Sequence, residues 1–389
     1  MALLGCTRKS APVTVAPEAD GRCLIPAGPG EPRDTLTVVL TDPVNLAHAP
    51  IPTNDSEQLL FRARSETLVQ VDCEGRAHPG AALAWRADSG RRAWVFTVRG
   101  SPYSSGDDSS AAATFVSSWR ARPAALNALG IEAASVEKGG GLSVIMREPL
   151  DSVPVIFADL ALAIFRETSA NPAVKYRLRP DDDPRDVLDQ GADLMVTRDP
   201  ALVDYAAGKP ELTTHPLPWS RTYLLLQPPG AGPIAQPVGR DAVRADAREA
   251  EPPFWWENRR ACGEPPVPLS GPSSNRVAYP RGDPTAQALA ERIVALASPG
   301  SDFRTFALER AAFTESVANG AERAYIIAVP RHSYAPCRDS AGWPSGSAVH
   351  ALIDTRAHAI VRRGTPSLHV DWDGTIRTAP PTGVPEEAR

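Results

Sequence analysis

The residue types that could support catalysis are present in this sequence, but their spacing does not match a catalytic site. Ser345 lies in Gly-Trp-Pro-Ser-Gly-Ser, which misses the spacing of a nucleophile elbow and is better interpreted as a turn. None of the seven histidines lies three or four residues from another on a convincing helix, so a histidine-based triad or metal site is not indicated. We therefore expect no enzymatic activity, no metal and no cofactor.

Aspartate followed by proline occurs where helices are expected to begin. Asp183, Asp199 and Asp283 can each accept backbone N–H groups at a helix start, where proline needs no donor. The three aspartates at 181–183 could suggest cation binding, but capping and the helix dipole explain them better. The Arg-Gly-Asp sequence at 281–283 is likewise interpreted as a cap rather than as an adhesion motif.

Paired tryptophans lie beside arginines in the stretch 253–263. Aromatic faces and guanidinium groups can bind planar or charged ligands, so this stretch is one candidate ligand platform. The favoured interpretation is a loop that Trp255 or Trp256 anchors in a hydrophobic pocket.

Length, charge and composition exclude several classes of protein. A chain of 389 residues suggests two or three domains, and a net charge of −5 offers no basic surface for nucleic acid. No apolar run approaches the roughly 20 residues that span a bilayer. The 40 prolines are about twice the average usage. They concentrate at 12–32, where we expect a flexible tether, and at 210–272, where we expect long surface loops.

The cysteines show no metal-ligand spacing, and most of them could pair as disulfides. They are Cys6, Cys23, Cys73, Cys262 and Cys337. With Cys6 set aside, the other four can form two disulfides in an exported protein. We favour Cys23–Cys73 and Cys262–Cys337, because each pair lies within one half of the chain. The alternative is four buried thiols in a cytosolic protein, and the cysteine count does not separate the two.

Strand and helix patterns alternate along the chain. Predicted strands lie at 35–41, 92–99, 174–179, 193–197, 322–330 and 358–363. Trp94, Phe96 and Val98 fall on one face of their strand, which is typical of a half-buried strand, and the glycines at 139–141 indicate a hairpin turn. Strand–helix–strand alternation predicts α/β layers with parallel pairing.

An ordered set of residues resembles the family 5 extracellular solute-binding proteins, the oligopeptide-binding type of ABC importers. The stretch 42–50 begins with an Asp-Pro turn after the first strand, and 65–119 follows the family's spaced leucine, aspartate, glycine, proline and aromatic positions. The matching residues are Leu68, Asp72, Gly75, Pro79, Leu83, Ala84, Trp85, Phe96, Val98, Arg99, Tyr103, Gly106, Phe115, Ser118 and Trp119. The stretches 183–206 and 277–329 are similar to later segments of the family, so the resemblance extends over most of 35–330.

The resemblance implies a two-lobed α/β clamshell of the type 2 periplasmic-binding class, with mixed sheets flanked by helices. Lobe 1 would comprise 34–210 and 345–389, and a shortened lobe 2 would comprise 211–344. Residues 1–33 would form the remnant of a lipobox and a proline-rich tether. The solute would be captured between the lobes, and a hinge motion would close them on it.

Ligand contacts are expected at strand ends and at the two crossovers between the lobes. In open α/β sheets, ligands collect at the carboxyl ends of strands. The candidates are Thr197, Arg198 and Asp199 at a strand end, and Trp219, Arg221, Tyr223 and Trp343 at the crossovers. Asp199 could instead be only a helix cap, and packing alone could account for the crossover residues.

Cys6 ends the sequence Leu-Leu-Gly-Cys, which matches a lipobox. The five residues before it are too few for the charged and apolar regions of a signal peptide, so either the true start lies upstream or Cys6 is incidental. The resemblance to lipid-anchored binding proteins favours acylation of Cys6. It also places the protein outside the cytoplasm, in the periplasm or at the cell surface.

The resemblance predicts a solute-binding protein that delivers a peptide or other small solute to an ABC transporter permease. We expect a monomer that contacts the membrane only through its N-terminal lipid and binds no nucleic acid. The alternative is a sensory or scaffold module without a transport role, in which the binding cleft is degenerate.

Overall fold

The fold comes from a computed structural model of the chain. It describes residues 23–28, 34–99, 108–150, 155–165, 173–231, 234, 274–297, 302–330 and 342–378. The expectations for Cys6, Cys262, Cys337 and the tryptophans at 253–263 lie outside these residues, as does most of the expected tether at 1–33.

Two compact units make up the structure, and two long strands carry the chain from one to the other. Unit 1 comprises Met1–Pro218 and Ala357–Arg389, and unit 2 comprises Trp219–Arg356. The chain leaves unit 1 on β13 (Leu212–Gln227) and returns on β17 (Ala348–Arg362). Both changes of unit therefore fall inside strands, after Pro218 and after Arg356, whereas the expected lobe boundaries were after 210 and after 344.

A mainly parallel sheet forms the centre of unit 1. β11 (Val174–Leu178), β2 (Leu36–Leu40) and β12 (Leu194–Thr197) are parallel neighbours, β12 is antiparallel to β17, and β13 follows. Val38 belongs to one hydrophobic cluster and Val39 to another, so both faces of the sheet are buried. Burial on both faces is typical of parallel strands covered by helices, and the predicted parallel pairing of these strands is confirmed.

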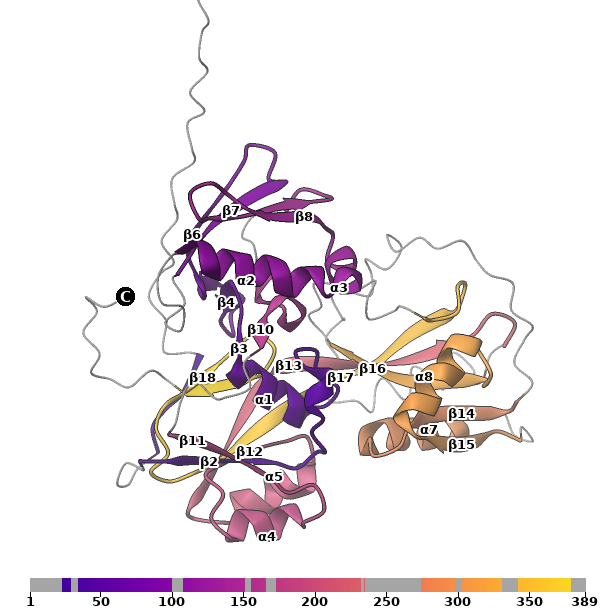
Figure 1. The fold of residues 1–389 in the computed structure, drawn as a ribbon. Coiled ribbons are helices and arrows are strands. Elements are labelled where there is room, and N and C mark those ends of the chain that lie inside the picture. Colours follow the sequence, from indigo (N-terminus) through magenta and orange to yellow (C-terminus); the bar gives the residue numbers. More distant parts are fainter. Residues whose placement is uncertain are drawn as a thin grey trace, which may run out of the picture. The chain divides into compact units, whose positions relative to one another are not determined.

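Helices cover both faces of this sheet (Figure 1). They are α1 (Asp55–Arg64), α4 (Pro184–Asp189) and α5 (Pro200–Ala207). Phe61 of α1 packs in the cluster of Val38, whereas Leu188 of α4 and Leu202 of α5 pack in the cluster of Val39.

Unit 1 also contains an antiparallel four-stranded sheet with one helix along it (Figure 1). Its strands, in order across the sheet, are β6 (Ala82–Ala87), β7 (Ala93–Val98), β9 (Leu142–Met146) and β8 (Ile131–Val136). The helix is α2 (Asp108–Arg120), followed by α3 (Pro123–Ala128). Trp94, Phe96 and Val98 are buried as the alternation predicted, and β8 and β9 form the predicted hairpin.

Aromatic rings fix α2 between this sheet and two short 3-10 helices, η3 (Val155–Ala158) and η4 (Leu160–Leu162). The Phe157 ring centroid lies 4.8 Å from that of Phe96 and 6.1 Å from that of Trp119. Trp119 Nε1 donates to the Leu162 carbonyl at 2.7 Å, so its buried polar atom is satisfied. These contacts hold the face of α2 that carries Trp119. The opposite face of α2 makes none of them.

Short strands complete unit 1. They are β1 (Leu24–Ile25), β3 (Ser65–Glu66) with β10 (Ile164–Phe165), β4 (Val69–Val71) with β5 (Ala77–Pro79), and β18 (Leu368–Val370) with β19 (Ile376–Thr378).

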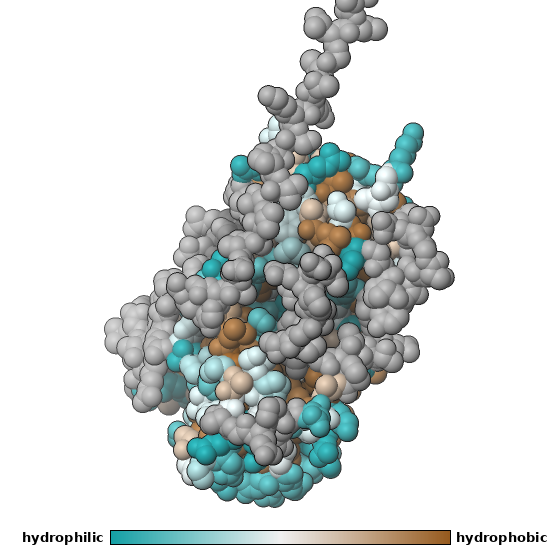
Figure 2. Space-filling model, turned by 90° about the vertical axis from the view of Figure 1, so that its left-hand side faces the viewer, coloured by the Kyte–Doolittle hydropathy of each residue, from teal (hydrophilic) through white to brown (hydrophobic). Residues whose placement is uncertain are grey.

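Figure 2 shows a mostly hydrophilic surface over α4, whereas hydrophobic residues reach the surface over the four-stranded sheet. Leu83 and Ile145 of that sheet are among the exposed large hydrophobic residues.

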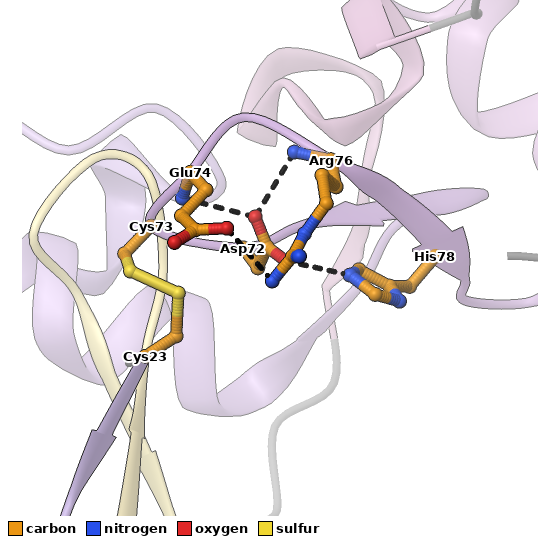
Figure 3. The surroundings of a disulfide bond; sticks show 6 residues. All are labelled: Cys23, Asp72, Cys73, Glu74, Arg76 and His78. Atoms are coloured by element: carbon orange, nitrogen blue, oxygen red, sulfur yellow. Dashed lines mark hydrogen bonds and ion pairs between the residues drawn. A yellow bond between two sulfur atoms is a disulfide. The ribbon is translucent and has the colours of Figure 1, made fainter. Parts of the chain in front are cut away.

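The expected Cys23–Cys73 disulfide is present and joins the residue just before β1 to the turn after β4 (Figure 3). β1 also pairs with β18, and Cys23 is buried. Residues 23–28, which fell in the expected tether, are therefore packed onto unit 1. The apolar residues Leu24 and Ile25 explain this, because they can pair with a strand edge whereas the surrounding prolines cannot.

The strands of unit 2 belong to the same eight-stranded hydrogen-bonded sheet, whose order is β11-β2-β12-β17-β13-β16-β14-β15, and helices cover both faces of the part in unit 2. β15 (Arg304–Leu308), β14 (Arg276–Pro280) and β16 (Ala324–Pro330) are parallel neighbours, and β16 is antiparallel to β13. Two hydrophobic clusters again flank the sheet: α7 (Pro284–Ala295) packs in one and α8 (Arg310–Asn319) in the other.

The three predicted helix caps are confirmed. The carboxylates of Asp183, Asp199 and Asp283 accept backbone N–H groups at 2.9 Å from the first turns of α4, α5 and α7. Within the described ranges, no helix is both long and apolar enough to span a membrane.

Candidate functional site

The candidate site is an open cavity of about 690 Å³ within unit 1. It lies where α2 and its C-terminal end approach β10 and the loop after β2. Its walls are formed by Ala49, Pro50, Ala113, Thr114, Ser117, Ser118, Ala121, Arg122, Ala163, Ile164 and Phe165. All of these residues are small, apolar or hydroxylated except Arg122.

Small side chains along one face of α2 line the cavity. Ala113 and Ser117 are four residues apart, and Ala121 follows at the same spacing just beyond the helix, so the three lie in line. Phe115 and Trp119 lie on the buried side and hold the helix in the core. The small side chains therefore leave open the space that larger residues would fill.

Arg122 provides the charge of the cavity. Its Nη1 donates to the Ala161 carbonyl at 2.6 Å, and its Nη2 donates to the Ala163 carbonyl at 2.8 Å. Its Nε donates to the Ser118 carbonyl at 3.2 Å, and Nη2 also bonds the Ser118 hydroxyl. Burial lowers the pKa of Arg122, although the guanidinium stays charged at any ordinary pH. The contacts fix the guanidinium at the cavity wall.

Glu57 holds the loop that supplies the opposite wall. Asn54 caps α1 by accepting the Glu57 N–H at 2.8 Å, and the buried Glu57 carboxylate accepts the N–H groups of Asn45 at 2.9 Å and Thr53 at 2.7 Å. His48 Nδ1 lies 2.8 Å from the same carboxylate. Burial opposes ionisation of Glu57, but the hydrogen bonds from Asn45, Thr53 and His48 outweigh it, so its pKa is lowered. Ala49 and Pro50 lie inside the loop that these bonds close.

The strand-end candidates lie together at the end of β12 and have intramolecular partners. Asp199 caps α5, and its N–H donates to the Thr197 hydroxyl at 3.1 Å. Arg198 Nε donates to the Asp55 carboxylate at 2.7 Å, which ties the strand end to the first turn of α1. None of the three lines the cavity of unit 1, and ligand contact by them stays a prediction.

The crossover candidates lie in unit 2. The Arg356 guanidinium lies 4.6 Å from the ring centroid of Trp219, and Tyr223 is buried with its hydroxyl donating to the Asp283 carboxylate at 3.0 Å. Arg221 pairs in register with Pro330 on β16, and Trp343 packs against a hydrophobic cluster. Their contact with a ligand likewise stays a prediction.

The cavity was not predicted from the sequence. Its wall residues come from three distant segments, and no local pattern marks Pro50 or Phe165 as neighbours of α2. The signal that the sequence offered was the small-residue spacing of α2 followed by Arg122.

Among the described residues, no group of three or more histidine, cysteine, aspartate or glutamate side chains could hold a metal ion. The small, apolar and hydroxylated walls beside Arg122 can contact a small solute.

Solved structures of binding proteins are similar to this chain over most of its length. The dipeptide binding protein from Pseudoalteromonas sp. SM9913 in complex with Met-Leu has a TM-score of 0.61 at 9% identity, covering 88% of this chain and 98% of that one. Haemophilus influenzae OppA complexed with RPPGFSPFR has a TM-score of 0.56 at 12% identity, covering 90% and 100%. NikA from Brucella suis in complex with Fe(III)-EDTA has a TM-score of 0.55 at 12% identity, covering 84% and 95%.

No protein-family model matches the chain, and no curated protein matches it in sequence. The structural similarity covers both compact units, and it agrees with the sequence resemblance over 35–330. The chain therefore has the mixed α/β fold of the family 5 solute-binding proteins, the periplasmic-binding class of fold.

Proposed function

We propose that this protein is the extracytoplasmic solute-binding component of an ABC importer and that it captures a peptide or another small solute. The observation that carries the proposal is the cavity of unit 1, because it is large enough for a small organic molecule and is walled by apolar and hydroxylated groups. The fold supports the proposal, since the similar structures are binding proteins. The protein binds its solute and does not transform it.

An extracytoplasmic location is supported by the disulfide. Cys23 and Cys73 are paired, and disulfides persist mainly in oxidising compartments. Acylation of Cys6 would anchor the protein to the membrane surface, and a pairing of Cys262 with Cys337 would add a second disulfide. The protein acts as a monomer that passes its solute to a permease.

The lobes of this binding protein correspond to 34–210 with 345–389 and to 211–344, with residues 1–33 carrying the lipidation site. The strand-end and crossover residues are further candidate solute contacts, separate from the cavity walls. They are Thr197, Arg198, Asp199, Trp219, Arg221, Tyr223 and Trp343.

Recovery of the natural solute tests this function. The protein is purified from its own host, denatured to release small molecules, and the released molecules are identified by mass spectrometry. Re-addition to solute-free protein is expected to raise the unfolding temperature, because a ligand at a hundredfold excess over Kd stabilises by about 2.7 kcal/mol. If neither host extract nor a peptide library raises that temperature, the proposal fails.

A sensory or scaffold module with a degenerate cleft is the second candidate. It is favoured by one observation: polar groups expected to face a ligand are engaged by the chain's own side chains, as Arg198 is by Asp55 and Tyr223 by Asp283. A protein that recovers no solute but co-purifies with a membrane receptor would support this candidate.

A further inference from the structure

We infer that the solute taken by the unit 1 cavity carries a carboxylate that binds beside Arg122, with an apolar portion against the walls formed by Pro50 and Phe165. This inference rests on the proposed function and specifies the chemical class of its solute. It follows from the charge of the cavity and from the way Arg122 is held.

Among the described residues that line the cavity, the charged group is a cation. Of the described residues that line it, only Arg122 carries charge, and none of them is a carboxylate. The ammonium group of a solute would therefore find no anionic partner in this cavity. A carboxylate would find one full positive charge in a partly desolvated setting, where charge pairing is stronger than in water.

Arg122 lacks the carboxylate partner that Arg62 and Arg198 of unit 1 have, and like Arg362 it donates to backbone carbonyls. Arg62 pairs with Asp373 at 2.6 Å, and Arg198 pairs with Asp55 at 2.7 Å. Among the described residues, no carboxylate lies within ion-pair distance of Arg122, which bonds only carbonyl and hydroxyl oxygens. Burial of a cation without a counter-ion is unfavourable, and a bound carboxylate relieves that cost.

The hydrogen-bond geometry limits how the carboxylate binds. The hydrogen bonds of Arg122 occupy four of the five guanidinium N–H groups, one from Nε, one from Nη1 and two from Nη2. One Nη1–H is left, so the carboxylate accepts one hydrogen bond from Arg122 rather than two. Hydroxyl groups of the α2 wall, such as that of Ser117, are available for its second oxygen.

The end of α2 opposes this attraction but is weaker. A helix C-terminus carries roughly half a negative charge, and α2 ends at Arg120 beside the cavity. Arg122 already bonds the Ser118 carbonyl at that end, and its full charge outweighs the partial one. The net field in the cavity therefore favours an anion.

Titration with matched acids and amides tests the inference on the full chain. Benzoate and benzamide have the same shape and differ in charge, and the benzene ring suits the apolar walls. We expect benzoate at millimolar concentration to shift the NMR signals of the Arg122 side-chain N–H and the Ala121 amide, and benzamide to leave them unchanged. Alanyl-phenylalanine and its C-terminal amide form a second pair, and the tighter of the two acids identifies whether the carboxylate comes from an organic acid or from a peptide.

Variants of arginine provide the controls. Arg122→Gln is expected to weaken benzoate binding about tenfold or more, the effect of one charge-assisted hydrogen bond, whereas Arg122→Lys retains part of the affinity. Arg120→Gln removes the same charge from an exposed position of the same helix and should leave binding unchanged. The Ala121 amide reports binding in every variant and also shows whether the cavity is still folded.

The outcomes separate the inference from the proposed function. If neither acid shifts Arg122, or if acid and amide shift it equally, the inference is overturned. A neutral or cationic solute recovered from the host would also overturn it, although the solute-binding function would stand. A host solute with a carboxylate whose binding is weakened in Arg122→Gln supports both.

Discussion

Asp72 and Asp371 occupy equivalent positions in two hairpins and pair with each other as an antiparallel β-bridge. Each follows a valine at the end of a short strand and is followed, three residues later, by a glycine with positive φ. The Asp72 N–H donates to the Arg76 carbonyl at 3.0 Å, and the Asp371 N–H donates to the Thr375 carbonyl at 2.8 Å. The two hairpins therefore share one turn geometry and meet at their aspartates.

The two aspartates differ in burial, which gives the first prediction. Asp371 is 4% exposed, pairs with Arg377 through both oxygens at 2.8 and 2.7 Å, and lies 4.0 Å from Arg62. Burial raises the pKa of Asp371 even though the two arginines oppose this. Asp371→Asn removes the carboxylate that pairs with Arg377 and one of the two near the buried Arg62, and it is expected to lower the free energy of unfolding by about 3 kcal/mol.

Asp72→Asn is the matched variant at the equivalent turn. The partners of Asp72, Arg76 and His78, are more exposed than Arg62. The free energy of unfolding is therefore expected to fall by only about 1 kcal/mol. Urea unfolding measures both values. Equal losses at the two positions would contradict the view that burial sets the difference.

The disulfide gives the second prediction. Replacing Cys23 and Cys73 together by serine removes a link between residues 50 positions apart and is expected to lower the free energy of unfolding by about 2 to 4 kcal/mol. Hydrogen exchange should also quicken at Leu24 and Ile25, whose pairing with β18 the disulfide supports. Unchanged exchange at these two amides would show that β1 holds its place without the link.

Glu57 gives a prediction for pH. Its pKa is lower than the ordinary value of 4.5, so the stability that the ionised carboxylate contributes is present above that value and is lost as pH falls through the folded-state pKa. Glu57→Gln is expected to cost about 1 to 3 kcal/mol at neutral pH and progressively less below pH 4.5.

The measurement is the unfolding free energy of wild type and variant across acidic pH. Glu315→Gln, at an exposed position of α8, serves as the control and should show no difference at any pH. A Glu57→Gln cost that stays constant with pH would mean that charge at Glu57 does not organise the loop.

Gly80 gives a further prediction, because the backbone of a neighbouring segment lies close to its Cα. A Cβ at this position would lie 2.4 Å from the Thr67 carbonyl oxygen and 2.9 Å from that of Leu68, both backbone atoms. Gly80→Ala is therefore expected to destabilise by about 1 to 3 kcal/mol through overpacking. Gly139→Ala adds the same methyl group where nothing lies within 4 Å, and thermal unfolding should show little change for it.

Local signals in the sequence predicted local structure well. Aspartate before proline identified the starts of α4, α5 and α7, because capping depends on adjacent residues alone. Alternation in 92–99 identified the buried face of β7 for the same reason. The Cys23–Cys73 pairing also agreed with the structure, although an alternative was open.

Features that depend on distant segments were not predicted. Tyr223 was expected to offer a hydroxyl to a ligand, yet its partner Asp283 lies 60 residues away and already caps α7. The cavity around Arg122 likewise requires α2, β10 and the loop at Pro50 to meet. Such convergence is set by tertiary packing, which neither periodicity nor spacing reveals.

Occupancy of the unit 1 cavity tests the central claim most directly. Native mass spectrometry of protein purified from its host would compare wild type with Ala113→Trp, which fills the cavity, and Ala124→Trp, which adds the same ring at an exposed site of α3 outside it. We predict a bound small molecule in wild type and in Ala124→Trp, and none in Ala113→Trp. A bound molecule that persists in Ala113→Trp, or none in wild type, would contradict the assignment of this cavity as the solute site.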